Sequence, residues 1–303
     1  MKSIGIIVFY FGKYPWYHDF FIDSCKRNQS IDFLFFTDNI SIQKQDENVK
    51  YIPFSIDKFN SIASTKLGFN VNVLNGLKIC DFRPAFGDIF SDYLKKYDYW
   101  GYSDTDIIYG NLRNFLDNET LTYDYISVRD DYPSGYFSVF KNENKINLLY
   151  TLSKDYKELF LKEENTLFEE CGGAYSEVCN GVNILNSSCN YETFHHVLEK
   201  NKDNLKILFE LFSIEGNVGE IKVLHEKLVF MKKFEIMMYH LTSYKANLFS
   251  IIPTKLLKPE FFINQYNFKK SKYDFSNIFI YLKKIYLFYI SKLISFSLKE
   301  NII

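Results

Sequence analysis

The chain has 303 residues, of which 47% are hydrophobic and 19% aromatic, and 36 basic against 37 acidic residues leave a formal net charge of −1. This near balance of charge excludes a dedicated nucleic-acid binder, which needs a basic surface. The length suits one large α/β domain or two smaller ones, with enough apolar side chains for a packed core.

The cysteines and the apolar runs bear on where the protein works. The five cysteines contain no Cys-x-x-Cys pair, and their odd number favours a reducing cytoplasm over a disulfide framework. No small-residue cleavage site follows the apolar run near the N-terminus, which therefore indicates a strand and not a signal peptide. No stretch reaches the roughly 18 uncharged apolar residues needed to span a membrane. We expect a cytoplasmic protein.

The first third of the chain alternates apolar runs with turn residues. Residues 4–10 form a continuous β-branched and aromatic run, typical of a strand buried on both faces, and two further runs occupy 31–36 and 49–54. Helical spacing over 17–28 places a helix between the first two strands. This β-α-β-β order predicts an open, largely parallel sheet whose ligand binds beyond the carboxyl ends of the strands.

The remainder of the chain predicts more of the same architecture. Helices are expected over 58–77 and 86–96. The later strands are expected, in chain order, over 97–102, 125–128, 135–140, 181–185 and 234–241. There is no internal repeat and no low-complexity linker. We therefore predict one domain over residues 1–252 and a helical, amphipathic tail over 253–303.

Asp104 and Asp106 follow directly after the aromatic run at 97–102. Two carboxylates spaced i, i+2 at a strand end can both reach one divalent cation, and their hard oxygen atoms suit Mg²⁺ or Mn²⁺. Such a cation neutralises the charge of a departing diphosphate. Asp-x-Asp alone also occurs in ordinary loops and caps. The apolar residues on both sides favour a ligand site here, because buried carboxylates need a compensating partner.

The stretch KICDFRPAFG at 78–87, followed by YDYWGYSDTDIIYGNL, resembles a bacterial family of glycosyltransferases that build capsules and other surface polysaccharides. This block is the specific part of a resemblance that extends from the first strand to about Lys245. The resemblance implies the GT-A fold, a Rossmann-like and mostly parallel sheet flanked by helices, with the catalytic domain in residues 1–252. It implies transfer of a sugar from a nucleotide-diphosphate donor, UDP-sugar by default, to a glycan acceptor of capsule, O-antigen or other surface polysaccharide, with Mn²⁺ or Mg²⁺ as cofactor.

The same resemblance assigns donor-binding roles to the ends of the first two strands. Tyr10, Phe11 and Gly12 would line the nucleotide pocket. Asp38 would lie near the base or the ribose.

According to the resemblance, Asp81 and Arg83, which lie about twenty residues before the Asp-x-Asp, would hold the donor. The arginine follows the aspartate by two positions here, whereas in distant relatives it follows by three positions. Judged locally, Arg83 could instead pair with Asp81 or Asp88. Within the Asp-x-Asp, the second acid, Asp106, would bind the metal directly. Asp104 would reach the ribose of the donor, or the metal through water.

The resemblance places the acceptor side in two segments. Ser134 and Gly135 lie in a turn where small residues would bring the backbone close to the bound nucleotide-sugar, although the residues alone also fit an ordinary hairpin turn. An inverting transferase needs a carboxylate that deprotonates the acceptor hydroxyl. Glu170 is the first choice for this base, followed by Glu169 and then Asp131. A solvated acidic helix end remains the alternative for the two glutamates, and both inversion and retention stay open.

The late segment MMYHLTSYK at 237–245 resembles the closing strand that returns a histidine to the metal and a lysine to the phosphates. His240 would be the third metal ligand, since imidazole suits Mn²⁺. Lys245 would stabilise the leaving diphosphate. A purely structural histidine at a strand end is the alternative.

Residues 277–299 are strongly apolar and aromatic, and on a helical wheel Lys284, Lys292 and Lys299 fall on one side. Such a helix could lie at the inner face of the cytoplasmic membrane, where a lipid-linked glycan acceptor would be found. It could equally dock on protein.

Two other functions remain open from the sequence. A sugar nucleotidyl or phosphosugar transferase would share the sheet and the metal, but Phe11-Gly12-Lys13 is too short for a triphosphate-binding loop. A non-catalytic glycan-binding or scaffold module would keep the GT-A-like sheet without needing Asp104 and Asp106, so the intact acids count against it.

Overall fold

The computed structural model describes residues 1–39, 46–215, 219–257, 260–271, 280 and 282–288. The chain divides into two compact units. The first comprises residues 1–15, 22–105 and 112–213, and the second comprises residues 16–21, 106–111 and the described residues from 214 onward. This division differs from the predicted boundary at residue 252, because two short segments from the first half of the chain pack with the C-terminal part.

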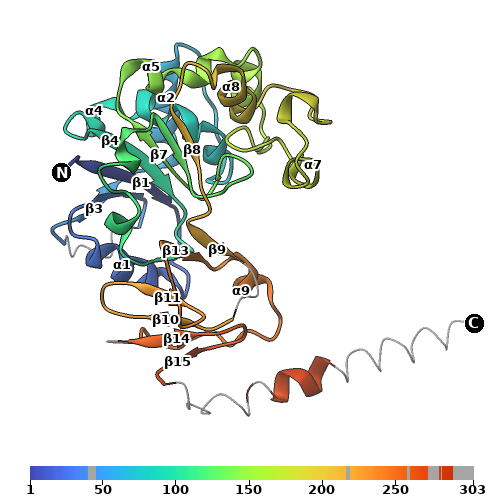
Figure 1. Cartoon of the computed structure of the whole chain (residues 1–303). Coiled ribbons are helices and arrows are strands. Elements are labelled where there is room, and N and C mark those ends of the chain that lie inside the picture. The colour runs from blue at the N-terminus through green and yellow to red at the C-terminus, as the bar shows by residue number, and fades with distance from the viewer. Residues whose placement is uncertain (40–45, 216–218, 258–259, 272–279, 281, 289–303) are drawn as a thin grey trace, which may run out of the picture. The chain divides into compact units, whose positions relative to one another are not determined.

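The first unit is built on a seven-stranded sheet of order β3-β2-β1-β4-β7-β6-β8 (Figure 1). The strands are β1 (Ile4–Tyr10), β2 (Asp32–Thr37), β3 (Val49–Pro53), β4 (Tyr99–Ser103), β6 (Tyr125–Ser127), β7 (Phe137–Lys141) and β8 (Ile207–Phe209). Strands β3, β2, β1 and β4 pair in parallel, as do β6 and β8, whereas β7 is antiparallel to β4 and to β6. The predicted α/β class is confirmed, and the sheet is mixed. Residues 128–136 connect β6 to β7. Parallel pairing would need a crossover of about a dozen residues or more, so this connection leaves the two strands antiparallel.

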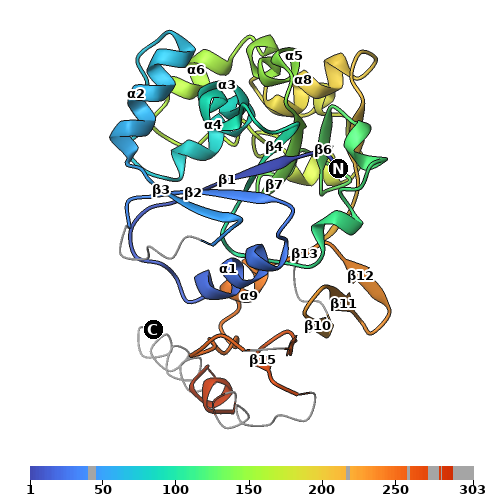
Figure 2. The same cartoon turned by 90° about the vertical axis from the view of Figure 1, so that its left-hand side faces the viewer.

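Helices flank this sheet on both faces. Helices α2 to α6 and α8 cover one face, and α1 lies against the other (Figure 2). The α-helices are α1 (His18–Arg27, assigned to this unit from residue 22), α2 (Ile56–Leu67), α3 (Phe86–Ile89), α4 (Ser91–Leu94), α5 (Asn144–Asn147), α6 (Tyr156–Leu161), α7 (Tyr175–Cys179) and α8 (Phe194–Asn201). The 3-10 helices are η1 (Lys78–Ala85), η2 (Leu112–Asn114), η3 (Thr120–Thr122), η4 (Leu149–Leu152) and η5 (Ile184–Asn186).

Local turn chemistry corrects three predicted elements. The expected helix over 58–77 ends at Leu67, because Gly68 adopts a left-handed conformation (φ 73°) that caps the helix. The expected helix over 86–96 is the pair α3 and α4. The strand expected over 181–185 is wrong, because Gly181 has φ 85° and the Asn183 side chain accepts the Leu185 N–H, which turns the chain into η5.

Aromatic side chains fill the core of the first unit. The fully buried Trp100 ring stacks on Phe140 with centroids 4.2 Å apart, and its indole N–H donates to Asn147 Oδ1 at 2.7 Å. The ring of Phe9 on β1 stacks on that of Phe36 on β2, with centroids 5.0 Å apart. Each such ring buries roughly 150–250 Å². Much of the aromatic content of the sequence therefore lies in this core, where it holds the strand ends in place.

The second unit contains two antiparallel sheets, one of order β12-β11-β10-β14-β15 and one of order β5-β13-β9. Its strands are β5 (Ile107–Tyr109), β9 (Ser213–Glu215, beginning at the last residue of the first unit), β10 (Ile221–Val223), β11 (Leu228–Phe230), β12 (Phe234–Ile236), β13 (Met238–His240), β14 (Phe261–Ile263) and β15 (Phe268–Lys269), and its short helix is α9 (Thr242–Ala246). Apolar residues of β10, β11 and β14 share a core with Trp16, whose ring lies 5.8 Å from that of Phe268.

Two further expectations change in this unit. The single strand predicted over 234–241 is two strands, β12 and β13, which belong to different sheets and are separated by the buried Met237. The helical tail predicted from residue 253 is wrong at β14 and β15. In β14 the first and third side chains are buried while the strand pairs with β10, which is a period-2 pattern and not a helical one.

Most of the segment 277–299, for which the sequence predicts membrane or protein contact, lies outside the described residues. Residues 282–288 are helical. Lys284 Nζ donates to the carbonyl oxygen of Ser250 at 2.5 Å, and the ring of Phe288 lies 5.3 Å from that of Phe249. In the part of the chain that is described, no helix has both the length and the apolar character needed to cross a membrane.

Candidate functional site

The tripeptide Asp104-Thr105-Asp106 belongs to both units, whose boundary falls between Thr105 and Asp106. In the first unit, the Asp104 N–H donates to the carbonyl oxygen of Tyr136 at 2.9 Å. In the second, the Asp106 carbonyl oxygen accepts the N–H of Leu241 at 2.8 Å. Two trans peptide units keep the Cα atoms of the two aspartates within about 7.6 Å of one another. Each carboxylate is therefore positioned by its own unit, and the chain itself tethers them together.

In the first unit, Arg83 on η1 is the cation of a buried cluster. Its guanidinium donates to the Asp104 carboxylate and to the carbonyl oxygen of Gly135, and it lies 3.6 Å from Glu169 Oε1. It also lies over the ring of Tyr102, 5.3 Å from the centroid. The alternative pairing of Arg83 with Asp81 or Asp88 is not found among the described contacts, and the role of Arg83 in holding the donor stays a prediction.

Glu169, which is buried, and Glu170, which is partly buried, join this cluster. Burial raises the pKa of Glu169 well above its usual value and outweighs the charge of Arg83, which acts to lower it. Glu169 Oε2 has no hydrogen-bond partner in the described structure. Burial also raises the pKa of Glu170, although hydrogen bonds act against it. A carboxyl group whose pKa is raised toward neutrality is suited to general acid–base chemistry.

Two donors orient the Glu170 carboxylate. The Gly135 N–H donates to Oε1 at 2.9 Å, and the Tyr175 hydroxyl donates to Oε2. A Cβ atom on residue 135 would collide with the Glu170 carboxylate, so the approach of backbone to carboxylate requires glycine. Gly135 therefore serves Glu170 directly, and its approach to a ligand stays a prediction. Tyr175 was not predicted, since a tyrosine five residues after a glutamate is no recognisable signal.

In the second unit, Asp106 is the buried carboxylate and it faces two basic side chains. His240 Nε2 lies 3.4 Å from Asp106 Oδ2, and Lys245 Nζ lies 2.5 Å from the same oxygen. Strand pairing explains the arrangement, since His240 lies opposite Ile107 in the β5–β13 ladder. Burial acts to raise the pKa of Asp106, but the interactions with His240 and Lys245 outweigh it and lower that pKa.

The surroundings of the two basic side chains complete this cluster. His240 Nδ1 lies 3.7 Å from Glu215 Oε2 at the end of β9, and the Lys245 ammonium lies over the ring of Tyr17, 5.1 Å from its centroid. Neither Glu215 nor Tyr17 has a sequence signal that links it to residue 240 or 245. Asp106 and His240 offer ligand atoms close enough to share one ion. A carboxylate and an imidazole are ligands that suit Mn²⁺, and a role for Asp104 beside them stays a prediction.

Asp81 has a structural role and does not face a ligand, contrary to the prediction. It is fully buried, and its carboxylate accepts hydrogen bonds from Lys78 Nζ at 2.7 Å and from the hydroxyl and the N–H of Thr166. The N–H of Phe168 also donates to it. A carboxylate so fully hydrogen-bonded fixes the segment that leads to Glu169, and has no capacity left for a donor substrate.

Ser134 is likewise turned inward. It is fully buried, its hydroxyl accepts the N–H of Phe137, and its carbonyl oxygen accepts the Tyr102 hydroxyl at 2.8 Å. The side chain therefore closes the β6–β7 turn, which is the alternative that the sequence left open.

The ends of β1 and β2 meet as the strand order predicts. The Gly12 N–H donates to Asp38 Oδ1 at 2.7 Å, and the Tyr10 hydroxyl donates to the carbonyl oxygen of Lys13. Phe11 packs against the edge of the main core. These residues form one corner at the carboxyl end of the parallel strands, and their role in nucleotide binding stays a prediction.

Asp131 lies apart from the Arg83 cluster. Arg129 binds both of its carboxylate oxygens, at 2.8 and 2.7 Å, and the Cys179 thiol lies 3.0 Å from Oδ2. Burial acts to raise its pKa, but the hydrogen bonds from Arg129 and Cys179 lower it overall. A carboxylate held in its ionised form by an arginine is a weak base, so Asp131 does not fit the third place given to it among the candidate bases.

The fold and the two clusters define an α/β protein with buried carboxylates beside basic side chains in each of two units. The chain belongs to the DUF6625 family, a family of unknown function that matches residues 6–272. No curated protein shows significant sequence similarity to it.

Proposed function

We propose that this protein is a metal-dependent glycosyltransferase of the GT-A type. It would transfer a sugar from a nucleotide-diphosphate donor, by preference a UDP-sugar, to a glycan acceptor in the synthesis of a bacterial surface polysaccharide. The observation that carries the proposal is the buried Asp106 carboxylate beside His240 Nε2 and Lys245 Nζ, just beyond the central strand β4. A parallel sheet region that ends in an Asp-x-Asp supports the same reading.

The second unit supplies the groups for the donor diphosphate. Asp106 and His240 would hold a divalent cation, with Asp104 contributing from two residues away. When bound, such a cation neutralises the diphosphate as the bond to the sugar breaks. Lys245 would release Asp106 and turn to a phosphate oxygen, which adds a positive charge where the leaving group becomes more negative.

The first unit supplies the base. Glu170 is held by the Gly135 N–H and the Tyr175 hydroxyl, and burial raises its pKa, which makes it a stronger base toward an acceptor hydroxyl. Arg83 would keep Asp104 in place next to this carboxylate. A base that accepts the proton as the hydroxyl attacks corresponds to the inverting course.

The test is a thermal-shift panel of nucleotide-sugars and nucleoside diphosphates, each with and without Mn²⁺. A ligand that binds only the folded protein raises the unfolding temperature by mass action. We expect stabilisation by UDP or a UDP-sugar that requires Mn²⁺ and disappears in Asp106→Asn. Asp203→Asn, which changes an exposed aspartate two residues after α8, is the control and should behave as the wild type.

Two outcomes would contradict the proposal. If the nucleotide stabilises the protein in excess chelator as much as it does with Mn²⁺, the metal has no part in donor binding. Donor binding without any slow release of sugar from the bound nucleotide-sugar would favour a non-catalytic binding module.

A further inference from the structure

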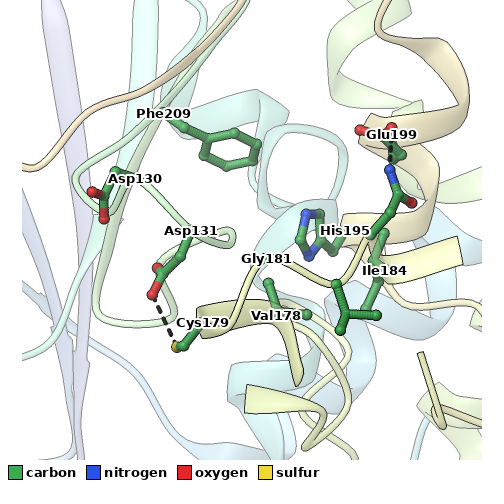
Figure 3. Close-up of a pocket in the computed structure, with 11 residues that line it drawn as sticks. Asp130, Asp131, Val178, Cys179, Gly181, Ile184, His195, Glu199 and Phe209 are labelled. Carbon is green, nitrogen blue, oxygen red and sulfur yellow. Dashed lines mark hydrogen bonds between the residues drawn. The ribbon is translucent and has the colours of Figure 1, made fainter. Parts of the chain in front are cut away.

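The first unit contains a cavity of about 470 Å³ that none of the roles above uses. It lies among the turn after β6, helix α7, the segment that leads into η5, helix α8 and strand β8 (Figure 3). Its volume is within the range of small-molecule sites. The lining residues are Asp130, Asp131, Val178, Cys179, Gly181, Val182, Asn183, Ile184, His195, Glu199 and Phe209.

His195 is the feature of this cavity that points to a ligand. Its side chain is only 7% exposed, and its Nδ1 atom is buried with no hydrogen-bond partner in the described structure. Burial lowers the pKa of His195 to about 4, so the ring is neutral at physiological pH. A buried polar atom without a partner costs free energy unless something binds it. The ring lies at the cavity wall, opposite Asp130 and Asp131 (Figure 3).

Two of the carboxylates that line the cavity are held in place by cations outside its lining. Arg129 binds Asp131 through two nitrogen atoms. Glu199 Oε1 accepts from Lys202 Nζ and from Asn183 Nδ2, each at 2.7 Å. Neither Arg129 nor Lys202 lines the cavity. Two of the three acids are thus fixed hydrogen-bond acceptors whose charge is already compensated.

The remaining wall is apolar. The rings of Phe209 on β8 and His195 make a T-shaped contact with centroids 5.8 Å apart, and Val178 of α7 and Ile184 of η5 add apolar lining. Lysine and arginine are absent from the lining in the described part of the chain. A phosphate or a nucleotide therefore finds acidic oxygens and no cation here. A neutral ligand with several hydroxyl groups and an apolar face finds acceptors on two sides and a ring to pack against.

We propose that this cavity binds one uncharged sugar residue in its ring form. The sugar hydroxyls donate to Asp130, Asp131 and Glu199, one hydroxyl pairs with Nδ1 of His195 after a turn of the imidazole, because that atom is closed to solvent in the present ring orientation, and the C–H face packs on Phe209. If the proposed function holds, that sugar is the terminal unit of the glycan acceptor, and this assignment rests on the proposed function.

The thiol of Cys179 provides a direct readout of occupancy. Cys179 is exposed and lines the cavity, whereas the other four cysteines are buried or partly buried. The rate at which iodoacetamide alkylates Cys179, followed by peptide mass analysis at mildly alkaline pH, should fall when the cavity is filled. The probes are the methyl glycosides of glucose, galactose, rhamnose and N-acetylglucosamine, with inorganic phosphate and a diamine such as putrescine as counter-probes. Neither nucleotide nor metal is added.

We expect at least one neutral glycoside to slow the alkylation of Cys179 in a saturable manner. Asp130→Asn and His195→Phe should each raise the half-protecting concentration about tenfold, as expected for the loss of a hydrogen bond to a charged or buried group. Asp130 is exposed, so its variant tests the site even if His195→Phe fails to fold. Asp203→Asn, outside the lining, should leave protection unchanged.

Three results would overturn the inference. Protection by putrescine but by no glycoside would make this an amine site, and protection by phosphate alone would make it an anion site. If no glycoside protects Cys179, the cavity does not bind a sugar.

Failure of the proposed function gives a different pattern. Loss of the Mn²⁺-dependent nucleotide shift alongside persistent protection by glycosides would leave a sugar-binding protein without transferase activity. Intact nucleotide binding without protection would leave the transferase and contradict only the present inference.

Discussion

The carboxylates Asp106 in the second unit and Glu169 in the first are both nearly inaccessible to solvent, at 6% and 2% exposed. Their pKa values nevertheless move in opposite directions. Asp106 shares one oxygen between His240 and Lys245, so its charged form is favoured despite burial. Among the described residues, the cation that contacts Glu169 is Arg83, which lies 3.6 Å away and also binds Asp104, so burial prevails. The number of cations at the carboxylate, and not the depth of burial, therefore decides whether its pKa is lowered or raised.

The largest effect expected on this contrast comes from the base itself. Glu170→Gln keeps the hydrogen bond from the Gly135 N–H but cannot accept a proton. We expect kcat for sugar transfer or for slow donor hydrolysis to fall by about 10²–10⁴-fold, with Mn²⁺-dependent nucleotide binding unchanged. The exposed Glu164→Gln is the control, and full activity of Glu170→Gln would transfer the base role elsewhere.

The next largest effect is expected from replacing Arg83, and it concerns the free energy of unfolding. Arg83→Met leaves the buried Glu169 and the partly buried Asp104 without their shared cation. Removing one partner of a buried ion pair costs about 3–5 kcal/mol. Urea unfolding should show a loss of this order, against a few tenths of a kcal/mol for Lys162→Met, which removes a solvent-exposed pair with Glu158. A loss as small as that of the control would mean that the Arg83 cluster does not hold the first unit together.

Lys245 competes for the oxygen that would bind a metal. In Lys245→Met, Mn²⁺ alone should bind about tenfold more tightly, because no ammonium has to leave Asp106 Oδ2. Nucleotide diphosphate binding should weaken by a similar factor, since one phosphate-binding cation is lost. Isothermal titration with each ligand separates the two effects, and Lys222→Met in β10 is the control. Equal weakening of both ligands would show that Lys245 does not compete with the metal.

The smallest effect lies in the pH dependence of stability, and it has opposite signs for the two acids. The lowered pKa of Asp106 gives stability that is present above its unfolded value of about 3.9 and is lost as pH falls through the folded value. The raised pKa of Glu169 gives stability that is present below about 4.3 and is lost as pH rises through the folded value.

Relative to the wild type, Glu169→Gln should therefore gain stability as the pH rises, and Asp106→Asn should lose its deficit as the medium becomes acidic. Changes on the order of 1 kcal/mol are expected in urea titrations across the acid and neutral range. Parallel pH profiles for the two variants would mean that the two acids titrate alike.

The sequence predicts the parts of this molecule that depend on local pattern. Continuous apolar runs give β1, β2 and β4 because strands buried on both faces need no alternation. The Asp-x-Asp and its position after β4 follow from the same reading. The pairing of Arg83 with Asp104, 21 residues apart, was not among the predictions.

What the sequence could not give depends on contacts between distant segments. Asp81 and Asp104 look equally suited to a ligand, but Lys78 and the N–H groups of Thr166 and Phe168 occupy Asp81. The orientation of Glu170 depends on Tyr175 and on Gly135, which lies 35 residues earlier. The apolar stretch over 234–241 shows no break at Met237, yet its halves pair with different strands.

Each unit contains one of the two tryptophans of the chain, Trp100 in the first and Trp16 in the second. Trp100 is fully buried against Phe140, while Trp16 is half-buried beside Phe268. Their fluorescence should consequently differ in wavelength, with Trp100 emitting further to the blue. Trp16→Phe and Trp100→Phe each leave a single emitter, so denaturation followed in the two variants reports on one unit at a time. Coincident curves would mean that both units melt in one cooperative step, and separated curves would give each its own free energy of unfolding.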